Sequence, residues 1–233
     1  NMDEKTYRKK VLGCWLGKAV GGTLGMPFEG DTSTRQITYY DPVPDRMLPN
    51  DDLDLQVIDL EIIRRFGLPV NRHHLTTLWE HLQDGGPDEY GAARWNYFLG
   101  RYAPLSGYYC NKFYAGIGAA IRSELWACLF PEDAQTAAHY ARADASVDHR
   151  ENGESVNGEV FLAVLESLAF GGGEVEPLIR KSLAYLPDGS KLKCAITDVL
   201  KWNAEGMDMN AILDCIIRDY GHSESAMVHQ NVS

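Results

Sequence analysis

The stretch NDDLDLQVIDLEIIRRF, residues 50–66, indicates the fold class of this chain. Asn50 is a good helix cap, Asp51 and Asp52 supply acids to the first turn, and Gly67 follows as a stop signal. The apolar residues between these ends recur at helical spacing: Leu53, Leu55, Val57, Ile58, Leu60, Ile62, Ile63 and Phe66. We therefore predict an amphipathic helix here.

Helical patterns of the same kind extend over most of the remaining chain. They predict helices over residues 7–24, 75–82, 90–98, 116–129, 133–147, 157–170, 177–186, 191–204 and 209–220, with a long proline-marked loop over 31–50. Glycines at spacing four in the first helix (Gly13, Gly17, Gly21 and Gly25) predict that another helix packs closely on that face and that this helix is central. No strand pattern, fixed repeat or domain linker stands out, so we expect an all-α, single-domain protein.

The composition excludes several classes of protein. The 233 residues are 45% hydrophobic and 24% charged, which is typical of a soluble globular chain. A net charge of −11 disfavours general nucleic-acid binding, and the absence of an apolar run of about 20 residues argues against a membrane span. Five scattered cysteines, without a Cys-x-x-Cys pair, favour reduced thiols, and we expect a cytoplasmic protein.

Three local patterns have the right residue types for chemistry, and each also has a purely structural explanation. Asp51 and Asp52, together with Glu29 and Asn50, offer the oxygen ligands that Mg²⁺ or Mn²⁺ takes, but they also suit a capped helix with solvated acids. The small-residue turn 116–122 suits an anion at exposed backbone amides, or else close packing between helices. His149 suits a phosphate or a carbonyl, or simply the dipole at a helix end.

In their order along the chain, these pieces resemble the ADP-ribosylglycohydrolase family. The segment GCWLGKAVGGTLGMPFE, residues 13–29, resembles the family's opening glycine-rich helix, which ends in Leu-Gly-x-Pro-x-Glu. Residues 50–53 (NDDL) take the place of its Thr-Asp-Asp-Thr motif. Residues 116–122 with Pro131 resemble the middle motif, and DASVDH at 144–149 resembles Asp-Ala-x-x-Thr-His. Four ordered matches between Val11 and Phe170 are more specific than any one of them.

The resemblance implies an orthogonal bundle of helices over residues 5–233, with two Mg²⁺ ions in a cleft. The implied reaction is hydrolysis of the N- or O-glycosidic bond between ADP-ribose, or a related ribosyl group, and an acceptor. It implies metal ligation by Asn50, Asp51 and Asp52, with Glu29, Asp51 and Asp52 as the catalytic group. It also implies substrate binding by Gly116, Gly118 and His149.

The chain departs from the family pattern at several positions. Gly22 stands where the common motif has Asp, and Asn50 and Leu53 replace its two threonines. The C-terminal Gly-x-Asp-x-Asp-Thr motif, which carries the remaining metal ligands, does not occur in the sequence. We therefore expect a C-terminally incomplete domain with weak metal binding, an inactive form, and self-association over exposed apolar surface. Two alternatives stay open: a non-catalytic module that binds ADP-ribose or a nucleotide, and a helical interaction protein.

Overall fold

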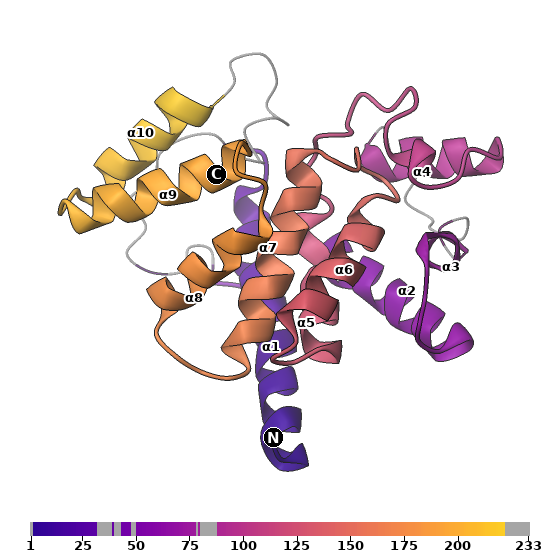
Figure 1. Ribbon diagram of the computed structural model, residues 1–233, viewed down its shortest axis with the longest axis horizontal. Coiled ribbons are helices and arrows are strands. Elements are labelled where there is room, and N and C mark those ends of the chain that lie inside the picture. Colours follow the sequence, from indigo (N-terminus) through magenta and orange to yellow (C-terminus); the bar gives the residue numbers. More distant parts are fainter. Residues whose placement is uncertain are drawn as a thin grey trace.

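A computed structural model describes residues 2–31, 39, 43–47, 50–77, 79 and 88–221. Within these residues the chain forms α-helices and short 3-10 turns and no strand, so the all-α prediction is confirmed (Figure 1). The ten α-helices are α1 (Glu4–Gly25), α2 (Asp51–Phe66), α3 (Arg72–Thr76), α4 (Glu89–Phe98), α5 (Glu124–Leu129), α6 (Ala134–Ala145), α7 (Glu154–Ala169), α8 (Val175–Ser182), α9 (Lys191–Ala204) and α10 (Met209–Tyr220).

Helix α7 lies at the centre of the molecule and contacts α5, α6, α8 and α9 (Figure 1). Its residues Val156, Val160 and Val164 recur every four positions and are fully buried. Such spacing places apolar side chains one above another on one face of a helix, and α6 packs against α7 with alanines at its own buried positions. Small residues on α6 let the two helices approach closely.

Stacked aromatic rings extend this core toward α5. Trp126 stacks on Tyr140 with ring centroids 5.4 Å apart, and Phe130 stacks on the same tyrosine at 4.9 Å. The indole N–H of Trp126 is satisfied inside the protein because it donates to a carboxylate oxygen of Asp144, 3.0 Å away. Burial of aromatic surface with its polar atom paired is a stable arrangement.

Helix α2 forms as the sequence predicts. The side-chain oxygen of Asn50 accepts a hydrogen bond from the Asp52 amide, 2.8 Å away, and Gly67 ends the helix at a φ of 70°, which glycine adopts without strain. Leu55 and Ile62 are buried on its inner face. The cap therefore determines where the chain turns into the helix and where the two adjacent aspartates lie.

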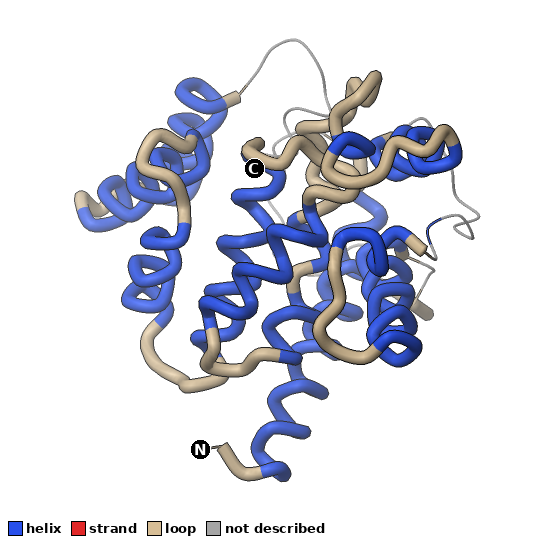
Figure 2. Tube along the Cα trace, turned by 45° about the vertical axis from the view of Figure 1, so that its right-hand side comes forward, coloured by secondary structure: helices blue, strands red, loops and turns tan. Residues whose placement is uncertain are grey.

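The prediction that glycines on α1 pack closely against another helix is wrong within the described residues. A Cβ atom built on Gly13, Gly17, Gly21 or Gly25 would meet nothing within 4 Å. No residue of α1 is fully buried, and the N-terminal part of the helix projects beyond the other helices (Figure 2). Gly22 is the exception: its Cβ would lie 2.5 Å from the side-chain nitrogen of Asn50.

A second helix also differs from its prediction. Residues 116–119 form a bend and a turn, a 3-10 turn spans Ala120–Arg122, and α5 begins only at Glu124, so Gly116 does not open a helix. The amide of Gly116 instead donates to the carbonyl of Phe113, 2.7 Å away. The predicted helix 75–82 corresponds to α3, which ends at Thr76; its later part and most of the loop 31–50 lie outside the described residues.

Two further expectations can be compared with the described residues. All five cysteines are free, as the sequence predicts. In this part of the chain, no helix combines the length and apolar character that crossing a lipid bilayer requires.

We expect Ile62→Ala to lower the free energy of unfolding by about 2–5 kcal/mol, because Ile62 is fully buried and its loss leaves a cavity. Leu60→Ala on the same helix is the control, since Leu60 is 48% exposed and its truncation should stay within about 0.5 kcal/mol. Urea unfolding followed by circular dichroism measures both. Equal losses for the two variants would contradict the packing of α2 described above.

Candidate active site

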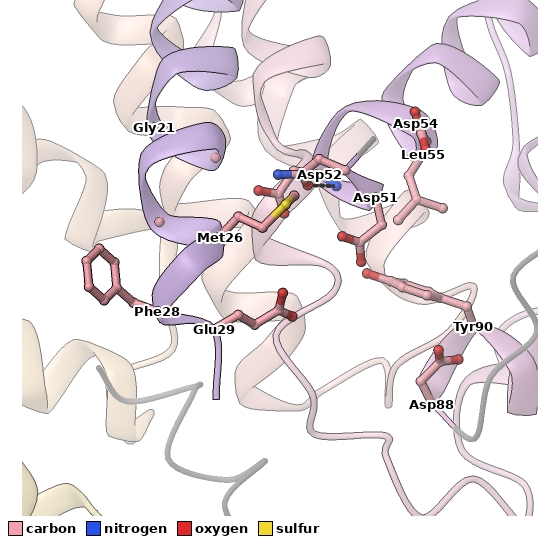
Figure 3. A pocket seen from close by; sticks show the side chains of 13 residues that line it. Gly21, Met26, Phe28, Glu29, Asp51, Asp52, Asp54, Leu55, Asp88 and Tyr90 are labelled. Atoms are coloured by element: carbon pink, nitrogen blue, oxygen red, sulfur yellow. Dashed lines mark hydrogen bonds between the residues drawn. The ribbon is translucent and has the colours of Figure 1, made fainter. Parts of the chain in front are cut away.

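A cavity of about 780 Å³ lies between the end of α1, the start of α2 and the start of α4 (Figure 3). The described residues that line it include five carboxylates and no lysine or arginine. They are Glu29, Asp51, Asp52, Asp54 and Asp88, together with Gly21, Gly22, Gly25, Met26, Phe28, Asn50, Leu55 and Tyr90. The structure therefore brings together four of the predicted site residues, Glu29, Asn50, Asp51 and Asp52, from two segments that are distant in sequence.

The two adjacent aspartates point in different directions. Asp51 extends toward the Tyr90 hydroxyl, whereas Asp52 extends toward α1, where its Oδ2 atom would lie 3.6 Å from a Cβ on Gly22 (Figure 3). Glu29 directly follows the 3-10 turn Met26–Phe28 after α1, and its carboxylate faces the same space as Asp51 (Figure 3). Asp51 and Glu29 are thus presented to a ligand from opposite walls of the cavity.

The surrounding protein makes both aspartates harder to ionise. Partial desolvation raises the pKa of Asp51, and the nearby charges of Glu89 and Asp54 raise it further, although the residue as a whole is exposed. Burial also raises the pKa of Asp52, while Lys18 opposes the effect. Carboxylates whose ionised form is destabilised in a cavity gain from a bound cation or can hold a proton for acid–base chemistry.

The donor set suits a hard cation only in part. Asp51, Asp52 and the Asn50 amide offer oxygens, which Mg²⁺ and Mn²⁺ prefer, but the Asn50 oxygen already caps α2. Among the described residues, no three side chains of His, Cys, Asp or Glu converge on one point that could hold a metal ion. The residues fit a cation that keeps most of its waters, and they do not make two closed metal sites.

The glycine turn adjoins Tyr90, but neither Gly116 nor Gly118 is among the described residues that line the cavity. The Gly118 amide donates to Oε1 of Glu89, 2.9 Å away. A Cβ on Gly116 would lie 2.6 Å from the same oxygen, and one on Gly118 would lie 2.4 Å from the Tyr90 hydroxyl. A side chain at either glycine would therefore have to displace the ends of the Glu89 and Tyr90 side chains.

His149 is fully buried beneath this turn. Its Nε2 atom lies 3.6 Å from Oε1 of Glu89, and its Nδ1 atom lies 2.8 Å from Oδ1 of Asp148, an ion-pair distance without the alignment of a hydrogen bond. The guanidinium of Arg122 contacts both oxygens of Asp148, at 2.7 and 2.9 Å, from the other side. The structure thus places His149 in a chain of buried charges that ends at Glu89.

These neighbours change the ionisation of the buried groups. Burial alone would lower the pKa of His149, but the charge of Asp148 outweighs it and raises that pKa to about 9. Burial alone would raise the pKa of Asp148, but Arg122 and His149 outweigh it and lower that pKa to about 2. His149 is therefore a cation at neutral pH.

Glu89 and Tyr90 are the site residues that the sequence patterns do not reveal. They stand in the first turn of α4, where an acid is ordinary at a helix start and gives no local signal. The only hint is indirect: two glycines in the turn 116–119 require a partner that approaches the backbone. That partner is far away in sequence and is identified only by the folded chain.

We expect His149 to give the protein a pH-dependent stability. Because the pKa of His149 is near 9 in the folded chain and near 6.5 when unfolded, its contribution is complete below pH 6.5 and is lost as the pH rises through about 9. The loss amounts to ~3 kcal/mol of unfolding free energy. His149→Gln should remove this slope, as measured by urea unfolding between pH 6 and 10. His139→Gln, at an exposed position on α6, is the control, and an unchanged slope in His149→Gln would contradict the assignment.

Comparison with known proteins gives one match. The family model for ADP-ribosylglycohydrolase covers residues 3–230 of the 233. Searches of curated proteins and of solved structures return no match.

Proposed function

The chain belongs to the ADP-ribosylglycohydrolase family, and from that premise we propose that it hydrolyses the N- or O-glycosidic bond between ADP-ribose, or a related ribosyl group, and an acceptor. The family match supports a glycohydrolase of this superfamily. The acidic cavity supports the more specific proposal of glycosidic bond hydrolysis, because Glu29 and Asp51 face each other across a space of about 780 Å³. A pocket of this size accommodates a small ligand.

The residues of the cavity have separate roles in this proposal. Glu29 takes a proton from the attacking water, and Asp51 orients that water and the ribosyl hydroxyls at the anomeric carbon. Asp51, Asp52 and Asn50 would hold Mg²⁺, or Mn²⁺ in its place. The bound cation would supply polarisation of the ribose oxygens and lower the pKa of a water. Without cations, five carboxylates would repel an anionic ligand.

Two observations favour a second candidate, a module that binds a ribosyl ligand without hydrolysing it. The described residues contain no three-ligand metal cluster, and Asn50 uses its side-chain oxygen as a helix cap. A chain that keeps the cavity but holds cations weakly would bind its ligand with little or no turnover. Measuring binding and hydrolysis on the same sample separates these two functions.

The missing C-terminal motif predicts an inactive form, but the family match and the acidic cavity support hydrolysis. We therefore expect release of the ribosyl group from at least one of ADP-ribosyl-arginine, an ADP-ribosyl-serine peptide or a nucleoside, in the presence of Mg²⁺. Asp51→Asn should lower kcat by at least about 10²-fold, the usual size of a proton-transfer or orienting contribution. Asp208→Asn is a matched control, because Asp208 caps the exposed start of α10 and Asn caps a helix equally well. Binding of these compounds without any product would contradict hydrolysis and favour the second candidate.

We also expect weak or no binding at paired metal sites. Since the described ligands come from one side of the cavity, each ion would keep a largely aqueous shell. Calorimetric titration with Mg²⁺ and with Mn²⁺ measures this directly. Two sites of submicromolar affinity would contradict the prediction, and Asp51→Asn would then show whether the ions bind in the cavity.

A further inference from the structure

A carboxylate of this chain already occupies the turn that resembles an anion site. Oε1 of Glu89 accepts a hydrogen bond from the Gly118 amide at 2.9 Å, and it lies 3.6 Å from Nε2 of His149. A backbone amide and a cationic imidazole are the donors that a phosphate oxygen would seek. Glu89 therefore takes the place that a diphosphate would need.

The fold holds Glu89 in this position. The residue is 6% exposed, and both glycines lack the Cβ that would collide with its carboxylate, at 2.6 Å from Gly116 and 2.5 Å from Gly118. His149 provides a positive charge, since Asp148 keeps it protonated. Both the shape of the turn and the opposite charge of His149 therefore hold the Glu89 side chain in place.

Two other backbone amides of this segment already donate to carbonyls of the chain, so they are not free to bind a phosphate. The Gly116 amide donates to the Phe113 carbonyl at 2.7 Å, and the Ala120 amide donates to the Ile117 carbonyl at 2.8 Å. A phosphate brought to this turn would compete with Glu89 for the Gly118 amide. It would also meet a buried negative charge, which repels it strongly where the effective dielectric is low.

The turn nevertheless adjoins the cavity. Asp88 and Tyr90, on either side of Glu89, line the cavity, and the Tyr90 hydroxyl points toward Asp51 (Figure 3). The same hydroxyl would lie 2.4 Å from a Cβ on Gly118. The negative charge of Glu89 helps to raise the pKa of Asp51. A charged ligand in the cavity therefore also interacts electrostatically with Glu89.

We propose that Glu89 is a specificity residue that disfavours binding of a diphosphate at the turn 116–119. This inference rests on the proposed glycosidase function. The site then prefers ribosyl glycosides that carry no diphosphate, of which a nucleoside is the simplest. A ribose with an uncharged substituent fills the cavity without displacing Glu89, whereas ADP-ribose must displace it or bind beside a like charge.

The test compares ADP-ribose with adenosine, by calorimetry, on the wild type and Glu89→Gln. The glutamine keeps an oxygen for the Gly118 amide and removes the charge, so we expect its Kd for ADP-ribose to fall at least tenfold and its Kd for adenosine to change less than twofold. Glu176→Gln on the exposed face of α8 is the charge-matched control and should change neither Kd. Glu89→Ala, which vacates the turn, should strengthen ADP-ribose binding in the same direction.

Two results would overturn the proposal. The first is an unchanged or weaker affinity of folded Glu89→Gln for ADP-ribose, and the second is no ADP-ribose binding by any of the variants. A measurement on the wild type covers the case in which the variants do not fold: inorganic pyrophosphate should not compete with adenosine at millimolar concentration, and competition would overturn the proposal. Hydrolysis is measured separately, so a tenfold shift without turnover supports the role of Glu89 while the proposed glycosidase activity fails.

Discussion

The buried guanidinium of Arg122 is the contact on which the site depends. It is fully inaccessible and pairs with both oxygens of Asp148, with Asp144 at 3.2 Å, and with the carbonyl of Gly118 at 3.0 Å. Taking charges out of water is costly, and a buried arginine is tolerated only when its donors are satisfied in this way. One side chain thus joins the glycine turn to the end of α6.

This network also explains the charge at the cavity wall. Arg122 holds Asp148 ionised, Asp148 keeps His149 protonated, and His149 with the Gly118 amide holds Glu89 in the turn. Each group is stabilised by the opposite charge of the next. The charge of the wall beside Asp51 therefore depends on a residue, Arg122, that is not among the residues lining the cavity.

Two of the departures from the family motifs turn out to be one feature. The side-chain nitrogen of Asn50 occupies the space that any side chain at position 22 would need, since a Cβ there would lie only 2.5 Å away. An aspartate at position 22 and the present position of Asn50 cannot coexist. A side chain at position 22 would therefore have to displace the end of the Asn50 side chain, so the two departures adjoin each other at the cavity.

The sequence by itself determined the helices that carry strong local signals and the acidic motif at the start of α2. Residues 191–204 and 209–220 are helical as predicted, because capping and the spacing of apolar residues act within a few residues of each other. Only the tertiary structure decided that Gly13, Gly17, Gly21 and Gly25 of α1 meet no neighbour among the described residues, that Gly116 does not open a helix, and that Glu89 contacts the turn 116–119. Each of these depends on a partner that is distant in the chain, and no local pattern records which residue a glycine or a carboxylate will meet.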